Sequence, residues 1–489
     1  MDRRVAALSG GAEGWLADYS SGGYYCELFG RPAAEAAHTR LLRRHLGRVP
    51  LADLARRAGE AEHELQVLGV TFTVYSDKDF IDRVLPFDAI PRVLSAAEWK
   101  TIERGVKQRV TAMNLFIADV YGPCRIFKDG IVPADLVLGN SNYRPEMREV
   151  DVPCGVYVHI CGIDIVRDDS GGFAVLEDNG RTPSGVSYVI ENRRLMRRAF
   201  PDLFEGIDVM PVEDYGLRLR QAMAEIAPPG IGDPQVVLLS PGIYNAAYFE
   251  HIFLAREMGV TLVEGRDLVV REDRVFMKTT AGFDPVHVIY RRLNDDFLDP
   301  EAFDPSSMLG VPGLFRAYRR GNVALANAIG TGVADDKAVY AYMPRIIRYY
   351  LGEDAILPNV ETRICRAPTA ETYTLDHLAE LVVKPVGESG GYGIVIGPRA
   401  SAAELDDCRA KLKANPANFI SQPMVRLSVC PTLAGGSAKP RHVDLRPFAV
   451  TGKDTWVLPG GLTRVALRAG SLIVNSSQGG GSKDTWVLA

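Results

Sequence analysis

The hydrophobic pattern of the chain switches repeatedly between helical and strand-like spacing. Apolar residues recur at helical spacing over 33–46 and 51–68, and a longer helix is predicted over 95–121. Ser95 and Glu98 form a capping box at the start of that helix, and a Gly-Pro pair follows its end. Short apolar runs predict strands at 71–75, 236–239, 260–263 and 286–290. This mixture predicts an α/β (α+β) protein.

The most informative stretch is 381–398, LVVKPVGESGGYGIVIGP. An apolar run ends at Lys384, a glycine-rich loop follows, and a second apolar run covers 394–396. This pattern predicts a β-hairpin whose loop lets backbone amides approach a ligand such as a phosphate. The spacing matches neither a Walker A loop nor a dinucleotide fingerprint. An ordinary glycine-rich hairpin remains the alternative.

A second informative stretch is VYVHICGIDIVRDDSGGFAVLEDN, which predicts two strands joined by the turn DDSGG. A turn centred between Ser170 and Gly171 places Asp164 opposite Glu177 on one face of the hairpin. Asn179 shares that face because side chains alternate along a strand. Two carboxylates and an amide oxygen at one strand end are the hard ligands that Mg²⁺ prefers. The alternative is that Asp164 and Glu177 form ion pairs with nearby arginines such as Arg167 or Arg181.

Basic side chains elsewhere are candidates for contacting phosphate. A helix capped by Asp335 or Asp336 carries Lys337 in its first turn, where a nearby anion would favour a lysine. An exposed lysine is the alternative. The stretch 443–450 has the alternating pattern of a strand, so one face would carry Asp444, Arg446 and Phe448. A later predicted strand, TRVAL, carries Arg464.

The region from 233 to about 293 is predicted to be an α/β unit in which a helix covers 244–258. Ligands of such units lie at the carboxyl ends of the strands. The candidates for contacting a substrate there are therefore Ser240, Tyr244, Asn245, Arg291 and Arg292. Polar loop residues without a ligand are the alternative.

Composition narrows the class of protein. The 489 residues carry a net charge of −5, which argues against a general nucleic-acid binder. No apolar run approaches the ~20 residues that span a bilayer, so we expect a cytoplasmic protein that does not bind membranes. The seven cysteines form no CxxC pair, which argues against a zinc site or a disulfide framework.

Eight motifs in order resemble the bacterial circularly permuted ATP-grasp type 2 family, over about 69–488. They are VLEDNGRTPSGVSY, SPGIYNAAYFEH, VEGRDLVV, NAIGTGVADDKAVY, VVKPVGESGGYG, RHVDLRPF, PGGLTRVAL and NSSQGGGSKDTWVL. The acidic strands precede the glycine hairpin, an order similar to that of glutathionylspermidine synthetase. The resemblance implies a circularly permuted ATP-grasp fold with a Rossmann-like pre-ATP-grasp domain and a helical N-terminal segment.

The implied units are a mostly helical segment, the first ATP-grasp part with the metal-binding strands, a pre-ATP-grasp-like substrate domain, a nucleotide-binding lobe with a glycine-rich lid, and a completing C-terminal part. We place them at 1–94, 95–230, 231–330, 331–430 and 431–489.

The resemblance also implies roles for individual residues. The nucleotide-contacting lysines would be Lys337 and Lys384, and Gln422 would lie at the adenine. The glycine-rich lid would cover the phosphates with residues that include Gly387, Ser389, Gly390, Gly391 and Gly393. The Mg²⁺ ligands would be Asp164, Glu177 and Asn179. Arg446, and less closely Arg464, would stabilise the transferring phosphoryl group.

The chain departs from glutathionylspermidine synthetase in two respects. Gly162 stands where that enzyme has an arginine, and the amidase domain has no counterpart. Glutathione and spermidine are therefore not the expected substrates.

Together these features predict an ATP- and Mg²⁺-dependent carboxylate–amine ligase that works through an acylphosphate and takes small-molecule or peptide substrates. Two alternatives remain. One is phosphoryl transfer to a small molecule, and the other is a non-catalytic ATP-binding protein that acts with a protein partner.

Overall fold

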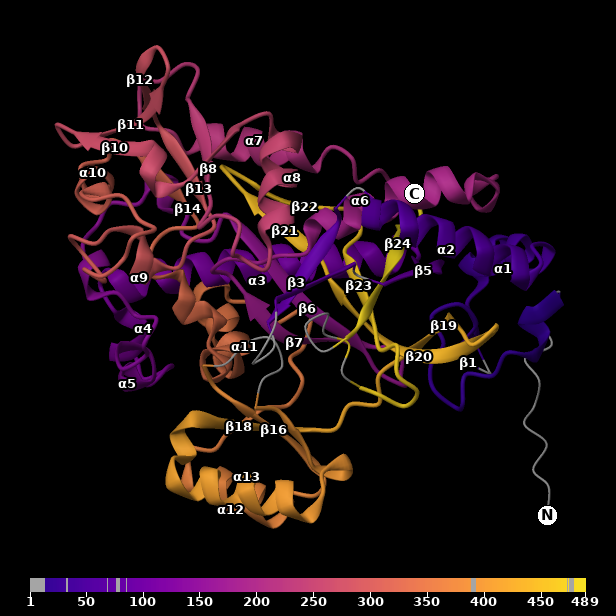
Figure 1. Ribbon diagram of the computed structural model, residues 1–489. Helices are drawn as coiled ribbons and strands as arrows, with labels where there is room; N and C mark the ends of the chain where they lie inside the picture. The colour runs from indigo at the N-terminus through magenta and orange to yellow at the C-terminus, as the bar shows by residue number, and fades with distance from the viewer. Residues whose placement is uncertain are drawn as a thin grey trace.

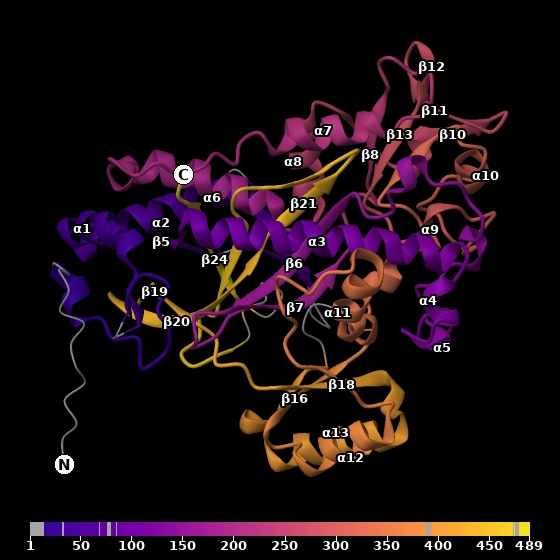
Figure 2. The same ribbon diagram turned by 180° about the vertical axis from the view of Figure 1, so that it is seen from behind.

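The computed structural model describes these residues of the chain: 14–31, 34–67, 69–75, 80–84, 86–387, 393–472, 474 and 479–489. Figures 1 and 2 show three units: a large central sheet with its helices, a parallel α/β unit beside it, and a small lobe that projects from the body. Within the described ranges, no helix combines the length and the apolar composition needed to cross a bilayer.

The central sheet has nine strands and joins segments that are far apart in the sequence. Its main order is β22-β21-β6-β20-β23-β24-β5, with β7 paired to β6 and β19 paired to β20. The strands are β5 (Phe87–Leu94), β6 (Ile160–Arg167), β7 (Phe173–Asn179), β19 (Val429–Ala434), β20 (Ser437–Arg446), β21 (Phe448–Thr451), β22 (Thr455–Val457), β23 (Leu462–Val465) and β24 (Gly481–Val487). The acidic hairpin β6–β7 therefore lies beside strands from the C-terminal part of the chain, as a permuted ATP-grasp order requires.

Different helices cover the two faces of this sheet. On one face, α3 (Ala96–Tyr121) packs into a hydrophobic core that includes Ile163 and Ile165 of β6. The other face packs against α6 (Val186–Ala199) in a second core. Because side chains alternate along a strand, Asp164 faces away from the α3 side. The charged residues described below gather on that face.

The predicted α/β unit is a four-stranded parallel sheet in the order β14-β13-β8-β9. Its strands are β8 (Val236–Leu239), β9 (Thr261–Val263), β13 (Val288–Arg291) and β14 (Ala324–Ala326). Its helices are α7 (Tyr215–Glu225), α8 (Tyr248–Met258), α9 (Asp295–Leu298) and α10 (Leu314–Arg319). A three-stranded antiparallel sheet extends from it, formed by β10 (Leu268–Arg271), β11 (Arg274–Thr279) and β12 (Gly282–Val286).

The small lobe is a four-stranded antiparallel sheet in the order β15-β18-β16-β17. Its strands are β15 (Arg363–Ile364), β16 (Leu381–Pro385), β17 (Val395–Ile396) and β18 (Phe419–Pro423). Two helices cover one face of it, α12 (Pro368–Asp376) and α13 (Ala402–Ala414), around a small core of their own. The helix α11 (Lys337–Leu351) leads from the body into this lobe.

The N-terminal part packs against the central sheet through the core that contains α6. It includes α1 (Arg40–Arg48), α2 (Leu51–Val67) and two antiparallel strand pairs. One pair is β1 (Gly30–Arg31) with β2 (Ala34–Glu35), and the other is β3 (Thr71–Tyr75) with β4 (Phe80–Val84). The short helices α4 (Arg125–Lys128) and α5 (Ala134–Leu138) follow α3. The predicted capping box of α3 is confirmed, because Ser95 N–H donates to Glu98 Oε2 at 2.8 Å and Glu98 N–H donates to Ser95 Oγ at 3.3 Å.

A buried histidine next to β6 predicts how stability depends on pH. Burial lowers the pKa of His159 to about 3, and neither ring nitrogen has a hydrogen-bond partner among the described residues. In the unfolded chain this histidine becomes protonated as pH falls below about 6.5, whereas in the folded chain it stays neutral. Stability is therefore lost as pH falls below that value. From this residue alone we expect a loss of about 2 kcal/mol between pH 7.5 and pH 5.

Denaturant titrations at pH 7.5 and pH 5 measure this loss. His159→Gln should reduce the difference between the two pH values by about 2 kcal/mol. A residual slope is expected from His251, whose pKa burial also lowers, and from Asp335, whose raised pKa acts in the opposite direction. The exposed His63 is the control site, and His63→Gln should leave the slope unchanged. An unchanged slope in His159→Gln would show that His159 accepts a proton in the folded protein.

Candidate functional site

The acidic hairpin has the side-chain pairing that the sequence predicted. Asp164 lies opposite Glu177, and Gly162 lies opposite Asn179. The turn itself is half a residue away from its predicted position, since Ile165 pairs with Val175 nearer the turn. The strand pair shifts register between Asp164 and Ile165, which leaves one extra residue in β7. This irregularity restores the predicted opposition of the two carboxylates.

Asp164 is buried and bound by two arginines from neighbouring strands. Arg446, the last residue of β20, donates from Nε to Asp164 Oδ1 at 2.5 Å and from Nη2 to Oδ2 at 2.9 Å. Arg464 of β23 donates from Nη2 to Oδ2 at 2.8 Å. Burial alone would raise the pKa of Asp164, but these two guanidinium groups hold it below its ordinary value.

The alternative prediction is that Asp164 and Glu177 form ion pairs with nearby arginines. Both carboxylates do form ion pairs, but with other partners than the predicted Arg167 and Arg181. Arg167 lies three residues from Asp164 along β6, and its guanidinium donates to Glu98 and Tyr25 instead. Arg181 lies near Asp335. The partners of Asp164 come from β20 and β23, so no local sequence pattern identifies them.

Asp444 completes this ionic cluster. It lies directly opposite Arg464 in the β20–β23 pair, and its Oδ1 accepts from Arg464 Nε at 2.9 Å. Burial raises the pKa of Asp444, and its contact with Arg464 opposes that effect. Both groups are buried, so each carboxylate of the cluster depends on a guanidinium partner. Sequence alternation had placed Asp444 on the face of Arg446 without assigning it this contact.

Gly162 makes room for the side chain of Arg446. A Cβ atom at this position would lie 3.1 Å from Arg446 Cδ and 3.3 Å from Pro183 Cβ. The aliphatic part of Arg446 thus crosses β6 where a larger residue would obstruct it. The departure from the glutathionylspermidine synthetase pattern at this position therefore has a packing reason in this chain.

Two lysines approach Glu177 from the small-lobe side. Lys337 begins α11, and its Nζ lies 3.0 Å from Glu177 Oε1. The helix is capped by Asp336, whose side chain accepts from the backbone N–H groups of Ala338 and Val339. Lys384 lies near the end of β16, where burial lowers its pKa to about 8 while the negative charge of Glu177 opposes that shift.

The glycine-rich hairpin is confirmed at its base. Val382 pairs with Ile396 across β16 and β17, and Gly393 adopts a positive φ of 70° beside Pro385. Gly387 follows β16 and is exposed. The rest of the predicted loop, Ser389, Gly390 and Gly391, lies outside the described residues.

Gln422 lies on β18 opposite Val382. It is buried, and its Nε2 donates to Thr362 Oγ1 at 2.8 Å. Its side chain is thereby held within the small lobe, and its backbone belongs to the strand next to β16.

The oxygen atoms at the hairpin fit a hard divalent cation. Asn179 donates from Nδ2 to the carbonyl oxygen of Gly162 at 3.3 Å, and this contact does not use its amide oxygen. Glu177 and Asn179 thus provide oxygen ligands of the kind Mg²⁺ takes. Both oxygens of Asp164 are instead engaged by guanidinium groups. No cluster of three His, Cys, Asp or Glu side chains in the described ranges has a metal-binding arrangement.

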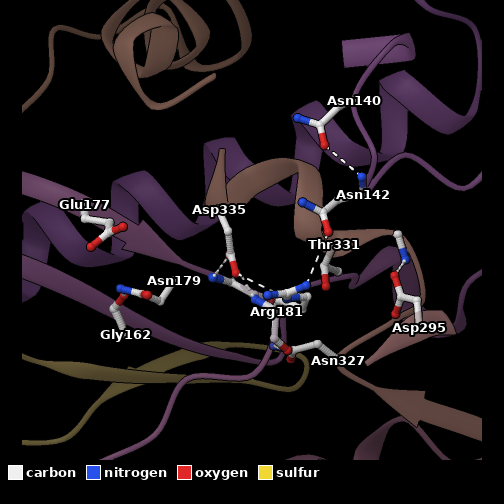
Figure 3. A network of polar contacts seen from close by, with 12 residues as sticks. Asn140, Asn142, Gly162, Glu177, Asn179, Arg181, Asp295, Asn327, Thr331 and Asp335 are labelled. Atoms are coloured by element: carbon white, nitrogen blue, oxygen red, sulfur yellow. Dashed lines mark hydrogen bonds and ion pairs between the residues drawn. The ribbon is translucent and has the colours of Figure 1, made fainter. Parts of the chain in front are cut away.

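The segment that follows β7 is held by polar side chains that include Asp335 and Asn327, as Figure 3 shows. Asp335 accepts from the backbone N–H groups of Gly180 at 2.5 Å and Arg181 at 3.1 Å. Burial raises the pKa of Asp335 to about 7. Asn327 donates from Nδ2 to the carbonyl oxygens of Ile160 and Gly180 at 2.7 and 2.8 Å. Sequence reasoning assigned no site role to Asn327, and it treated Asp335 only as a possible helix cap.

Several residues predicted to contact a substrate instead make internal contacts in the α/β unit. Ser240 is fully buried, with Oγ 2.9 Å from His251 Nδ1. The Asn245 side chain accepts from Ala247 N–H, and α8 begins at Tyr248 rather than at the predicted Tyr244. An Asx turn at Asn245 competes with helix there. Tyr244 is 78% exposed.

Arg291 is a buried residue at the carboxyl end of β13, where its side chain hydrogen-bonds the backbone. It donates to the carbonyl oxygens of Asn327, Leu293 and Ala328, and its Nη2 lies 2.7 Å from Asp295. Its donors therefore satisfy buried backbone acceptors of the fold.

Arg292 links the α/β unit to the acidic site. It donates to the Pro183 carbonyl oxygen at 2.7 Å and contacts Glu250 Oε1 at 3.3 Å. Glu250 in turn accepts from the backbone N–H of Gly185 at 2.7 Å. The neighbouring carbonyl oxygen of Ser184 accepts from Arg446. The segment 183–185 thus contacts both Arg292 and Arg446.

Residues 91–466 match the family model described as circularly permuted ATP-grasp type 2. The chain belongs to this family. The family and the strand order together establish the predicted circularly permuted ATP-grasp fold, with the acidic hairpin ahead of the glycine-rich lobe.

Similar proteins occur in several bacteria. The chain is 52% identical to an uncharacterized protein of Synechocystis sp. over 97% of its own length and 98% of that protein. It is 53% identical to an uncharacterized protein of Mycobacterium tuberculosis over 86% of its length and 76% of that protein. A Frankia casuarinae protein with the provisional name glutamate–cysteine ligase 2-2 is 42% identical over 95% of this chain, which spans only 53% of that protein.

Among solved structures, a glutathione synthetase-like effector of Globodera pallida has a TM-score of 0.57 and 13% identity. The match covers 90% of this chain and 98% of that protein. At 13% identity this similarity is evidence for a shared fold only.

The contact between Gly162 and Arg446 can be tested by substitution. We expect Gly162→Ala to lower the free energy of unfolding by about 1–2 kcal/mol, because the new Cβ crowds Arg446 and Pro183. Urea denaturation measures the change. The control is Gly232→Ala, a site where an added Cβ meets nothing within 4 Å. In an Arg446→Ala background, which removes Cγ and Cδ, the cost of Gly162→Ala should shrink, and an undiminished cost would mean that Arg446 is not the residue crowded.

The position of Lys384 predicts an effect on nucleotide binding. If Lys384 contacts a phosphate as the family resemblance implies, Lys384→Met should weaken ADP binding at least about tenfold, since a charge-assisted hydrogen bond is lost. Fold stability should change little, because removing a buried cation also removes its desolvation cost. Calorimetric titration with Mg²⁺ and ADP measures the affinity. Lys411→Met, which alters an exposed lysine of the same lobe, is the control. Equal affinities of the two variants would contradict the assignment.

Proposed function

We propose that this protein is an ATP- and Mg²⁺-dependent ligase that joins a carboxylate to an amine through an acylphosphate. The observation that carries the proposal is the convergence of complementary charges at one hairpin. Arg446 and Arg464 arrive from the central sheet, while Lys337 and Lys384 arrive from the small-lobe side. Membership of the ATP-grasp family supports the same reading.

In the proposed reaction, ATP binds between the small lobe and the acidic hairpin. Lys337, Lys384 and the glycine-rich loop hold its phosphates, and the strand that carries Gln422 meets the adenine. Glu177 and Asn179, together with Asp164, would hold Mg²⁺, which supplies charge neutralisation at the phosphates. These residues position the γ-phosphoryl group toward the face that carries Arg446.

The chemistry then takes two steps. A substrate carboxylate oxygen attacks the γ-phosphorus, and the bond to ADP breaks. The amine nitrogen attacks the acyl carbon of the resulting acylphosphate, phosphate leaves, and the nitrogen gives up a proton. Arg446 and Arg464 offset the negative charge on the phosphoryl group as it moves. Closure of the glycine-rich loop would exclude water and limit hydrolysis of the acylphosphate.

The substrates are proposed only as a class, a small-molecule or peptide acid and an amine. The glutamate–cysteine ligase name belongs to a protein about twice as long as this chain, so glutamate and cysteine are candidates and no more.

Phosphate release from ATP and Mg²⁺ tests the proposal. The protein is incubated with pools of amino acids, small peptides and polyamines, each alone and in pairs, with N-acetylated amino acids as the set that offers an acid without an amine. We expect phosphate release that requires both an acid and an amine. In Glu177→Gln the rate of release should fall at least about a hundredfold, because a proposed carboxylate ligand of Mg²⁺ is lost. Glu380→Gln removes an exposed carboxylate of the small lobe and should behave as wild type.

The outcomes separate three activities. Release that needs an acid alone and yields a phosphorylated product would replace the ligase with a phosphotransferase. Tight nucleotide binding without release in any pool would favour a non-catalytic ATP-binding protein. Release that is unchanged in Glu177→Gln would contradict the proposed site.

A further inference from the structure

The carboxylates at the acidic hairpin already have cationic partners within the protein. A carboxylate offers about four acceptor positions. Asp164 uses three of them, one on Oδ1 and two on Oδ2, for Arg446 and Arg464. Glu177 Oε1 contacts Lys337 Nζ at 3.0 Å. Any cation that binds Asp164 must therefore share this carboxylate with two guanidinium groups or replace one of them.

Sharing with both guanidinium groups is unfavourable because like charges repel strongly at short range in a buried site. Asp164 is 2% exposed, so water screens this repulsion poorly. Replacement is the remaining route, and the two arginines differ in how firmly they are held.

Arg464 is the firmly held arginine. It lies inside β23, 6% of its side chain is exposed, and Asp444 accepts from its Nε at 2.9 Å. Its removal from Asp164 would leave it beside Asp444. It would remain buried and charged.

Arg446 is the arginine that can leave. It is the last residue of β20, and 14% of its side chain is exposed. Among the described residues, the other hydrogen-bond acceptor of its guanidinium group is the Ser184 carbonyl oxygen at 3.3 Å. A guanidinium group at this position can exchange a carboxylate for a phosphate, which it binds with the same paired geometry.

We propose that Arg446 and a divalent cation compete for Asp164, and that the phosphates of a bound nucleotide end the competition by drawing Arg446 away. The inference rests on the proposed function, since it assumes a nucleotide at this hairpin. Its consequence is that Arg446 weakens binding of the metal alone. Metal and nucleotide then bind cooperatively, because the phosphates that attract Arg446 free the carboxylate for the metal.

Manganese provides a direct readout that does not depend on turnover. The affinity of the full-length protein for Mn²⁺ alone is measured from the electron paramagnetic resonance signal of the free ion. We expect Arg446→Gln to bind Mn²⁺ roughly tenfold or more tightly than wild type, because a competing positive charge is removed. Arg446→Lys, which keeps the charge but loses the paired contact, should fall between them.

The matched control is Arg441→Gln, the same charge change five residues earlier on β20. Arg441 donates to the carbonyl oxygens of Leu467 and Pro440, and Asp164 is not among its hydrogen-bond partners. It should bind Mn²⁺ as wild type does. The gain in Arg446→Gln should also disappear when Asp164→Asn is added. Circular dichroism and thermal unfolding establish that each variant is folded.

Three results would overturn the inference. They are equal Mn²⁺ affinity in wild type and both Arg446 variants, an equal gain in Arg441→Gln, and a gain that persists with Asp164→Asn. Calorimetric titration of wild type with Mg²⁺ and ADP is the separate test of the proposed function. Absence of nucleotide binding there would remove the proposed function, while the Mn²⁺ series would still decide whether Arg446 and the metal compete.

Discussion

The burial of Asp164 is the constraint on which the arrangement of the site depends. A buried carboxylate without a partner is very costly, so the fold must bring a cation to it. Arg446 and Arg464 lie 282 and 300 positions further along the chain, and the antiparallel pairing of β6 with β20 and of β20 with β23 delivers them. The ionic cluster therefore links the two ends of the permuted domain at the place where the chemistry is proposed.

The same constraint explains why the charges of the site balance locally. Carboxylates on the central sheet face guanidinium groups of the same sheet, while Glu177 at the end of β7 faces Lys337 at the start of α11. The second pair spans the junction between the body and the helix that leads into the small lobe. Contacts of this kind change partners readily when a polyphosphate arrives, because the phosphate and the carboxylate are alternative acceptors for one cation.

Residues around the site serve mainly to hold one segment of backbone. The segment after β7 donates N–H groups to Asp335 and Glu250, while its carbonyl oxygens accept from Asn327, Arg292 and Arg446. Buried backbone groups need such partners, because each unpaired one costs free energy. This requirement explains why polar residues at the carboxyl ends of the parallel strands, which resemble ligand contacts in sequence, are largely occupied within the fold.

The sequence by itself determined the family, the capped helix α3, the strand–glycine–strand hairpin, and the opposition of Asp164 and Glu177. These features depend on local spacing, which a linear chain displays directly. Only the tertiary structure decided that Asp164 pairs with Arg446 and not Arg167, and that Arg291 supports backbone carbonyls. Ion-pair partners and burial depend on which distant strands become neighbours. The physical reason is that local patterns record which face a residue occupies, while the charge it meets there comes from elsewhere in the chain.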